Sequence, residues 1–224
     1  MSPRRRGSAE LGRAGSRSLE HRTGNAIFYV VTEGGRTELD YLDWLNKIYG
    51  PRCKFHIRTL LPRTQQNGLK PSDVLEHACH LAAQPDIKQI WGLFDHDERP
   101  DIDQVCLRAK PGRVHLALSH PSFEMWLLLH LREFTPGHRQ DGKSGPIIDK
   151  LRSAHPSFAD YGKRRKRIDK SHFDALMEGD GIRKAVHRAR CLSRHFARET
   201  PSQRDPSTEV YRLIEALGIV PPPS

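Results

Sequence analysis

Residues 26–35 read AIFYVVTEGG, and their pattern indicates how the rest of the chain folds. Seven uncharged residues, most of them apolar, lead directly into Glu33 and two glycines. A short continuous apolar run is typical of a strand buried on both faces of a parallel sheet. Residues 89–98, QIWGLFDHDE, repeat the pattern, because a second apolar run ends at Asp95 and Asp97. The two stretches predict two strands of one sheet, each followed by acidic residues.

Further strands and helices are expected around these two runs. The additional elements are strands at residues 54–60 and 113–118 and helices at residues 38–49 and 72–83. Apolar residues recur at helical spacing in both helical segments, and Thr37 and Ser72 stand where an N-cap residue is expected. Strands that alternate with helices form right-handed βαβ units. The sequence therefore predicts an α/β fold with a Rossmann-like, mostly parallel four-stranded sheet flanked by helices.

The acidic residues after the two strands are predicted to meet at one edge of the sheet. In open α/β sheets the ligand site lies beyond the carboxyl ends of the strands. Neighbouring strands lie about 4.8 Å apart, so Glu33, Asp95 and Asp97 could share one or two divalent cations. The Asp95 and Asp97 pair also fits an ordinary turn or a helix cap. The metal hypothesis therefore depends on all three acids converging.

A metal at this edge points to phosphoryl-transfer chemistry. A bound metal can stabilise charge on a transferring phosphoryl group and lower the pKa of a bound water. Glu33 is then either a further ligand or the general base that activates the water. Arg36 stands where it could meet phosphate oxygens. The alternative for Arg36 is a solvated arginine near the start of a helix.

A further carboxylate follows the fourth predicted strand. Residues 119–124 read SHPSFE and open a helix that has Glu124 in its first turn. This position places Glu124 at the same edge of the sheet and makes it a candidate metal ligand. The alternative is a plain first-turn glutamate that interacts favourably with the helix dipole.

The excess positive charge is concentrated in one part of the chain. The net charge is +10, yet residues 26–160 contain equal numbers of basic and acidic residues. Residues 161–200 contain twelve basic and five acidic residues, a net charge of +7. This segregation favours a polyanionic partner, with Lys163, Arg164 and Lys166 as candidate phosphate-binding residues. The alternative is a solvated helix face.

Composition divides the chain into three predicted segments. These are a disordered basic arm at 1–24, the α/β core at 25–134 and a helical, basic C-terminal extension packed on the core at 135–224. The extension is expected to contain a helix at residues 182–198. Asp205, followed by a proline, is typical of a helix start and predicts a final helix at residues 206–217.

Several classes of protein are not indicated by the sequence. No apolar run approaches the roughly 18 residues that a membrane span needs. The N-terminus lacks the apolar segment of a secretory signal, so a cytoplasmic protein without membrane association is expected. The four cysteines form no CxxC pair, which favours free thiols over a zinc site or a disulfide. Trp91 and Trp126 lie inside apolar segments and are predicted to be core residues.

Four stretches carry a family resemblance. They are YVVTEGGRTE at residues 29–38, FDHDE at 94–98, SHPSFEMWLLLH at 119–130 and DPSTEV at 205–210. Together they resemble the RloB-like family of prokaryotic defence proteins, and the positions of the acids resemble the Toprim arrangement of topoisomerases, bacterial primases and OLD-type nucleases. The chain departs from the family pattern at His120 and Asp205, because the family tends to have Asn before these prolines.

The resemblance implies Mg²⁺-dependent phosphodiester chemistry, with Mn²⁺ as the other candidate cofactor. It implies that Asp95 and Asp97 are metal ligands and that Glu33 is a ligand or an acid/base residue. It also implies a role in phage defence, often encoded beside an AAA-type ATPase. Lys163, after Tyr161, is similar to a lysine in the C-terminal half of the family.

Taken together, the sequence predicts a metal-dependent nuclease, and analogy with defence nucleases slightly favours RNA over DNA as its substrate. The candidate residues are Glu33, Asp95 and Asp97 for catalysis, the same three with Glu124 for metal binding, and Arg36, His96, Lys163, Arg164 and Lys166 for substrate phosphates. One alternative is a non-catalytic sensor that binds nucleic acid or a nucleotide and works with the ATPase partner. Another is a basic docking surface with a merely structural acidic edge. The sequence leaves open whether the chain forms a homo-oligomer.

Overall fold

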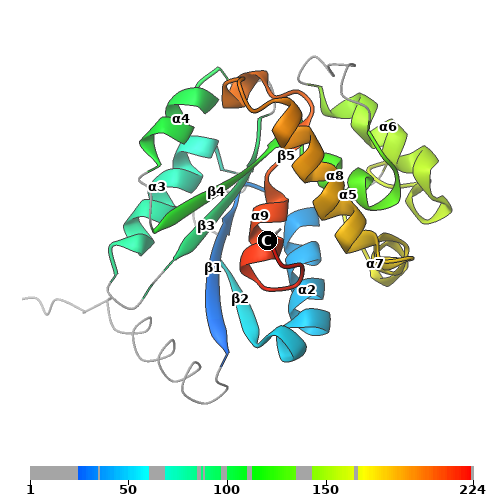
Figure 1. Cartoon of the computed structure of the whole chain (residues 1–224), viewed down its shortest axis with the longest axis horizontal. Helices are drawn as coiled ribbons and strands as arrows, with labels where there is room; N and C mark the ends of the chain where they lie inside the picture. The colour runs from blue at the N-terminus through cyan, green and yellow to red at the C-terminus, as the bar shows by residue number, and fades with distance from the viewer. Residues whose placement is uncertain are drawn as a thin grey trace, which may run out of the picture.

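The computed structural model of the chain describes residues 25–34, 36–60, 69–84, 87, 89–96, 100–109, 113–134, 143–163 and 166–222. Among these residues, five strands form one sheet in the order β2-β1-β3-β4-β5 (Figure 1). The strands are β1 (Ala26–Thr32), β2 (Phe55–Leu60), β3 (Ile90–Asp95), β4 (Val114–His120) and β5 (Ser207–Thr208). The first four are parallel, and β5 runs antiparallel to β4. The predicted α/β class is confirmed, and the antiparallel fifth strand is an addition to it.

Helices cover both faces of the sheet. They are α2 (Thr37–Cys53), α3 (Pro71–Ala82), α4 (Ile102–Arg108), α5 (Glu124–Leu131), α6 (Ser144–Ala154), α7 (Lys170–Met177), α8 (Gly181–His195) and α9 (Val210–Ala216), with the 3₁₀ turns η1 (Pro156–Phe158) and η2 (Pro201–Gln203). Helices α3 and α4 lie on one side of the sheet, and α2, α5 and α9 lie on the other (Figure 1).

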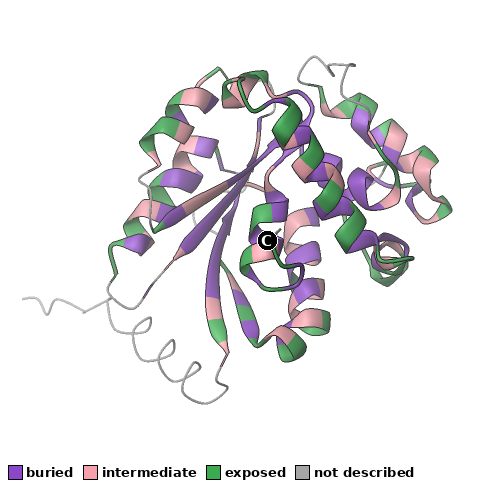
Figure 2. Cartoon of the chain, in the orientation of Figure 1, coloured by how far each residue is buried: buried purple, intermediate pink, exposed green. Residues whose placement is uncertain are grey.

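The central strands are buried on both faces, as their continuous apolar sequence predicts. In β1, Phe28 and Val30 enter the core on the α2 side, while Tyr29 and Val31 enter the core on the α3 side. Figure 2 shows this burial running along β1, β3 and β4. Their carboxyl ends therefore emerge at one edge, between two layers of helices.

Helix α5 is the centre of the larger core. All five residues from Met125 to Leu129 are 0% exposed, so the helix is enclosed on every side. Helices α6, α7, α8 and α9 contribute to the same continuous core, and residues after position 135 therefore complete the α/β unit. Trp126 is 0% and Trp91 is 4% exposed, which confirms that both are core residues.

The first residues of two helices and the last residue of a third differ from the sequence prediction. Helix α2 begins at Thr37 itself after Arg36, and α3 begins at Pro71 after Lys70, so Thr37 and Ser72 are not N-cap residues. Helix α8 ends at His195, three residues before the predicted end. The larger error lies in the final helix, predicted from residue 206.

The final helix begins at Val210, because the residues before it join the sheet. The backbone N–H of Glu209 donates to the carbonyl of Leu118 at 2.8 Å, and Thr208 Oγ1 lies 3.0 Å from Ser119 Oγ. The Asp205–Pro206 peptide bond is cis, as is the His120–Pro121 bond. Pairing with β4 thus replaces the helix start that the local Asp-Pro sequence predicts.

No described helix has the length and apolar character required to cross a bilayer. All four cysteines are free thiols. The predicted basic arm at residues 1–24 lies outside the described residues.

Candidate active site

Glu33 lies where β1 ends and points toward β3. Its backbone N–H donates to the carbonyl of Leu93 at 2.9 Å, which extends the pairing of the two strands. Its side-chain Oε2 accepts a hydrogen bond from the backbone N–H of Asp95 at 2.9 Å. The two predicted acidic positions are therefore brought together, because β1 and β3 are neighbours in the sheet.

Asp95 is the last residue of β3, and its surroundings disfavour ionisation. Burial raises the pKa of its carboxyl group well above the usual value, and the charges of Glu38, Glu124 and Glu33 raise it further. Lys166 acts in the opposite direction. Four carboxylates from the ends of two strands and the starts of two helices thus lie close enough to repel one another.

Glu38 is a member of this group that the sequence analysis missed. It lies in the first turn of α2, and a Cβ atom at Gly34 would overlap its carboxylate, so the two positions are in direct contact. Burial raises the pKa of Glu38 to about 7, and the charges of Glu124 and Glu33 contribute. The sequence signal was present, because a helix that starts just after a strand-end acid returns to the same edge of the sheet.

Glu124 opens α5 and is held by residues from the C-terminal half of the chain. It is 3% exposed, its Oε1 accepts from the hydroxyl of Tyr161 at 2.9 Å, and the same oxygen lies 3.1 Å from Lys166 Nζ. The Tyr161 oxygen also lies 2.9 Å from Thr37 Oγ1 on α2. Glu124 is therefore more than an exposed first-turn glutamate.

Opposing effects set the charge of Glu124. Burial alone would raise its pKa, but Lys166 and hydrogen bonds including that from Tyr161 outweigh burial, and the pKa lies below its usual value. Glu124 is thus ionised in the same cluster in which Asp95 resists ionisation. We call Glu33, Glu38, Asp95 and Glu124 the carboxylate cluster.

Two other predicted site residues follow the end of β3. Asp97 lies outside the described residues, so its convergence with Glu33 and Asp95 stays a prediction. His96 is 8% exposed, and its ring stacks on His120 with centroids 3.9 Å apart. Successive side chains of an extended chain point to opposite faces, so His96 is directed away from the side that Asp95 faces. His120 Nε2 lies 4.0 Å from Asp205 Oδ2 on that other side.

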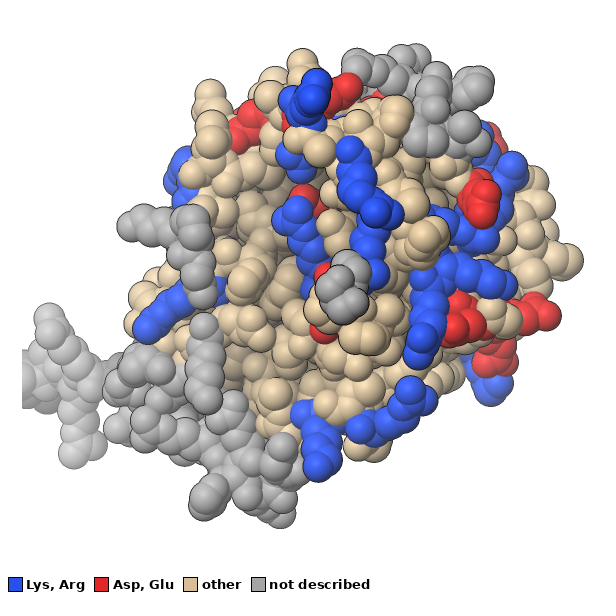
Figure 3. Space-filling model, in the orientation of Figure 1, with Lys and Arg blue, Asp and Glu red and all other residues tan. Residues whose placement is uncertain are grey.

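The predicted phosphate-binding residues occupy different places. Lys166 contacts Glu124, and Lys163 is exposed and lies 2.7 Å from Asp160. Arg36 is exposed just before α2, and Arg164 lies outside the described residues. Elsewhere, Lys and Arg side chains follow the outward face of α8 (Figure 3). Among the predicted cations that the structure describes, Lys166 is thus the one in contact with the carboxylate cluster.

The carboxylate cluster provides oxygen atoms that could ligate a metal ion. Within the stretches that the structure describes, no three His, Cys, Asp or Glu side chains come close enough to hold a metal ion. The carboxylate oxygens nevertheless fit a hard divalent cation, which prefers such ligands. Its charge would offset the burial and the repulsion that together raise the pKa of Asp95.

A family model described as RloB-like protein matches residues 28–217. The match runs from β1 to the end of α9 and includes every member of the carboxylate cluster. No curated protein and no solved structure matches the chain. Since the model spans well over half of the 224 residues, the chain belongs to the RloB-like protein family.

Proposed function

We propose that this protein is a metal-dependent nuclease that hydrolyses phosphodiester bonds of RNA or DNA in prokaryotic defence against phages. The observation that carries the proposal is the carboxylate cluster, in which Glu33 accepts a hydrogen bond from Asp95 and four acids lie at one edge of a mostly parallel sheet. Ligand sites of open α/β sheets lie at this edge. Membership in the RloB-like family and the resemblance to Toprim acidic positions support the same chemistry.

Glu33 and Asp95 are the residues we assign to hold Mg²⁺ or Mn²⁺, together with Asp97 from the sequence motif. When bound, such an ion stabilises charge on the phosphoryl group and lowers the pKa of a coordinated water. The chain itself supplies the oxygen ligands, and the hydrogen bond from the Asp95 backbone N–H orients the carboxylate of Glu33. Lys166, partly exposed beside Glu124, is placed to contact a phosphate oxygen of the substrate.

The test is a cleavage assay on total tRNA and on DNA, with Mg²⁺ or Mn²⁺ and with EDTA as the reference. It is run with and without the AAA-type ATPase that we expect as a partner. Asp95→Asn and Glu33→Gln are expected to abolish cleavage while the proteins remain folded. Asp43→Asn is the matched control, because Asp43 lies on α2 and its 59% exposed side chain pairs with Lys47.

We expect metal-dependent cleavage by the unmodified protein and by the Asp43→Asn variant. The Asp95→Asn variant is expected to show no cleavage. Cleavage that survives both Asp95→Asn and Glu33→Gln would contradict the proposal. Binding of nucleic acid without turnover, with and without the ATPase, would also contradict it and would favour a sensor role.

A further inference from the structure

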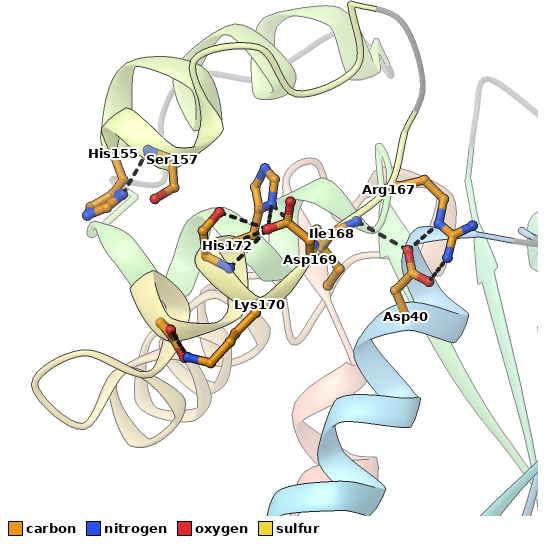
Figure 4. Close-up of polar contacts among 10 residues, drawn as sticks. Asp40, His155, Ser157, Arg167, Ile168, Asp169, Lys170 and His172 are labelled. Carbon is orange, nitrogen blue, oxygen red and sulfur yellow. Dashed lines mark hydrogen bonds and ion pairs between the residues drawn. The ribbon is translucent and has the colours of Figure 1, made fainter.

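A pocket of about 670 Å³ is lined by residues of η1, of the start of α7 and of the segment between them. Side chains that line it and matter here are Ser157, Tyr161, Lys163, Arg167, Asp169 and His172. We call it the η1–α7 pocket. Figure 4 shows its polar contacts, with side chains from η1, from α7 and from the segment leading into α7. Its volume is within the range of pockets that bind small molecules and cofactors.

The cationic side of the pocket is fixed in place by α2. The guanidinium of Arg167 donates from Nε and Nη2 to the two carboxylate oxygens of Asp40, at 2.7 Å and 2.6 Å. The backbone N–H of Ile168 donates to the same carboxylate at 3.2 Å. A guanidinium carries five N–H groups, so this ion pair leaves N–H groups of Arg167 for an anion. Figure 4 shows this fork between Arg167 and Asp40.

The opposite side of the pocket is ordered by the start of α7. Asp169 Oδ1 accepts from the backbone N–H of Ser171 at 3.0 Å and lies 2.7 Å from His172 Nδ1. Hydrogen bonds from Ser171, opposed by burial and assisted by His172, hold the pKa of Asp169 at about 2. The carboxylate of Asp169 therefore caps the N-terminus of α7. Its contact with His172 holds the imidazole ring at the wall of the pocket.

Aromatic rings form another part of the lining. Phe158, 0% exposed, supports the His172 ring at a centroid distance of 4.7 Å, and the rings of Tyr161 and His172 are 6.4 Å apart. Flat π surfaces on a protein favour flat ligands such as nucleobases, which every nucleotide carries. The lining thus combines the cations Lys163 and Arg167 with the carboxylates of Asp160 and Asp169, aromatic rings and hydroxyl groups.

Tyr161 connects this pocket to the carboxylate cluster. Its hydroxyl group bonds to Glu124 and to Thr37, while the same residue lines the pocket. A ligand in the pocket would therefore lie one side chain away from Glu124. A single nucleotide of a polynucleotide substrate has the required parts, because it carries both an anionic phosphate and a flat base.

We propose that the η1–α7 pocket binds one nucleotide of a single-stranded nucleic acid next to the carboxylate cluster. Lys163 and Arg167 contact its phosphate, and the base lies against the His172 ring, because Tyr161 is only 3% exposed. This inference rests on the proposed function, since it names a substrate subsite of the same site. It predicts that the substrate is unpaired at this position, because a base in a pocket cannot remain stacked in a duplex.

The first experiment measures binding of a fluorescent single-stranded oligonucleotide to the full-length protein in EDTA, by anisotropy. Lys163→Glu is compared with Lys170→Glu, because each lysine is exposed and each pairs with an aspartate of its own segment, Asp160 or Asp174. The pocket predicts that Lys163→Glu weakens binding about tenfold, the loss of a charge-assisted contact. Lys170→Glu is expected to bind within about twofold of the unmodified protein.

The second experiment fills the pocket and tests small ligands. Ser157→Trp places a large ring at the lining, and Ser153→Trp places the same ring on the exposed surface of α6. Adenosine 5′-monophosphate is expected to bind the Ser153→Trp protein and to lose binding to Ser157→Trp, by calorimetry. Inorganic phosphate that binds as tightly as the nucleotide would overturn the proposal in favour of a simple anion site.

The outcomes separate this inference from the nuclease proposal, because binding in EDTA does not require cleavage. Binding that is lost in Lys163→Glu and Ser157→Trp supports the pocket even if the unmodified protein never cleaves. Unchanged binding in both variants overturns the pocket, even if the protein proves to be a nuclease. Adenosine 5′-monophosphate and a tri-glutamate peptide are also compared as competitors of the bound oligonucleotide. Equal displacement by the peptide would overturn the proposal too, because the peptide is anionic but carries no base.

Discussion

Glu38 has a pKa of about 7 because burial, assisted by the charges of Glu124 and Glu33, disfavours its ionised form. A carboxyl group with a raised folded-state pKa contributes stability that is complete below its unfolded pKa, near 4.5, and is lost as the pH rises through about 7. Glu38→Gln removes this dependence. The metal-free protein should therefore lose about 3 kcal/mol relative to Glu38→Gln between pH 4.5 and pH 8.

Urea denaturation in EDTA across this pH range provides the measurement. Glu76→Gln is the control, because Glu76 lies on the exposed surface of α3. A free-energy difference between Glu38→Gln and the unmodified protein that stays constant with pH would contradict the electrostatic picture of the cluster.

Tyr161→Phe tests the connection between Glu124 and α2. The substitution removes the hydroxyl group that lies between Glu124 Oε1 and Thr37 Oγ1 and leaves the ring in place. Leaving a buried carboxylate short of a donor costs about 1–3 kcal/mol of unfolding free energy. Tyr49→Phe is the comparison, because its hydroxyl donates to the weak acceptor Met177 Sδ. Equal denaturation midpoints for the two variants would show that the Tyr161 hydroxyl group stabilises the fold no more than the Tyr49 hydroxyl group does.

The individual site residues were predictable to different degrees. Glu33 and Asp95 follow continuous apolar runs, which indicate strands of one parallel sheet, and the carboxyl ends of such strands share one edge. Glu38 looked like an ordinary first-turn residue, because its contact with Gly34 depends on the tight turn between β1 and α2. The partnership of Glu124 with Tyr161 joins residues 37 positions apart, and no local pattern encodes it.

Among the elements, long and strongly patterned ones were predicted and short ones were not. Strands β1 to β4 and helices α2 and α3 lie within a few residues of their predicted bounds. Strand β5 has two residues, too few to show any alternation, and it forms because β4 offers a partner edge. The Asp205–Pro206 sequence indicated a helix start, and long-range pairing overrode that local preference.

Helix α5 packs against elements from both halves of the chain, in one continuous core. Leu128 on this helix is 0% exposed, and its replacement by alanine is expected to lower the unfolding free energy by about 2–5 kcal/mol. Leu107→Ala removes the same atoms from a residue that is 85% exposed on α4, and it should have little effect. Thermal denaturation of both variants checks this, and similar melting temperatures would contradict the central place of α5.

On the scale of the whole molecule, the two halves of the chain meet at the candidate site. The acids come from β1, α2, β3 and α5, while Tyr161 and Lys166 come from the basic C-terminal half. The sequence predicted a neutral core and a basic extension packed on it, but not that Tyr161 and Lys166 would contact Glu124. Tyr161 lines the η1–α7 pocket and bonds to Glu124, so one side chain links this pocket to the carboxylate cluster.

The central claim is that the carboxylate cluster holds a divalent cation. The most direct test is a titration with Mn²⁺, in which electron paramagnetic resonance measures how much Mn²⁺ remains free. The unmodified protein and Asp43→Asn should bind Mn²⁺ at micromolar to millimolar concentrations, and Asp95→Asn should lose this binding. Equal Mn²⁺ binding by Asp95→Asn, or no binding by the unmodified protein, would contradict the account.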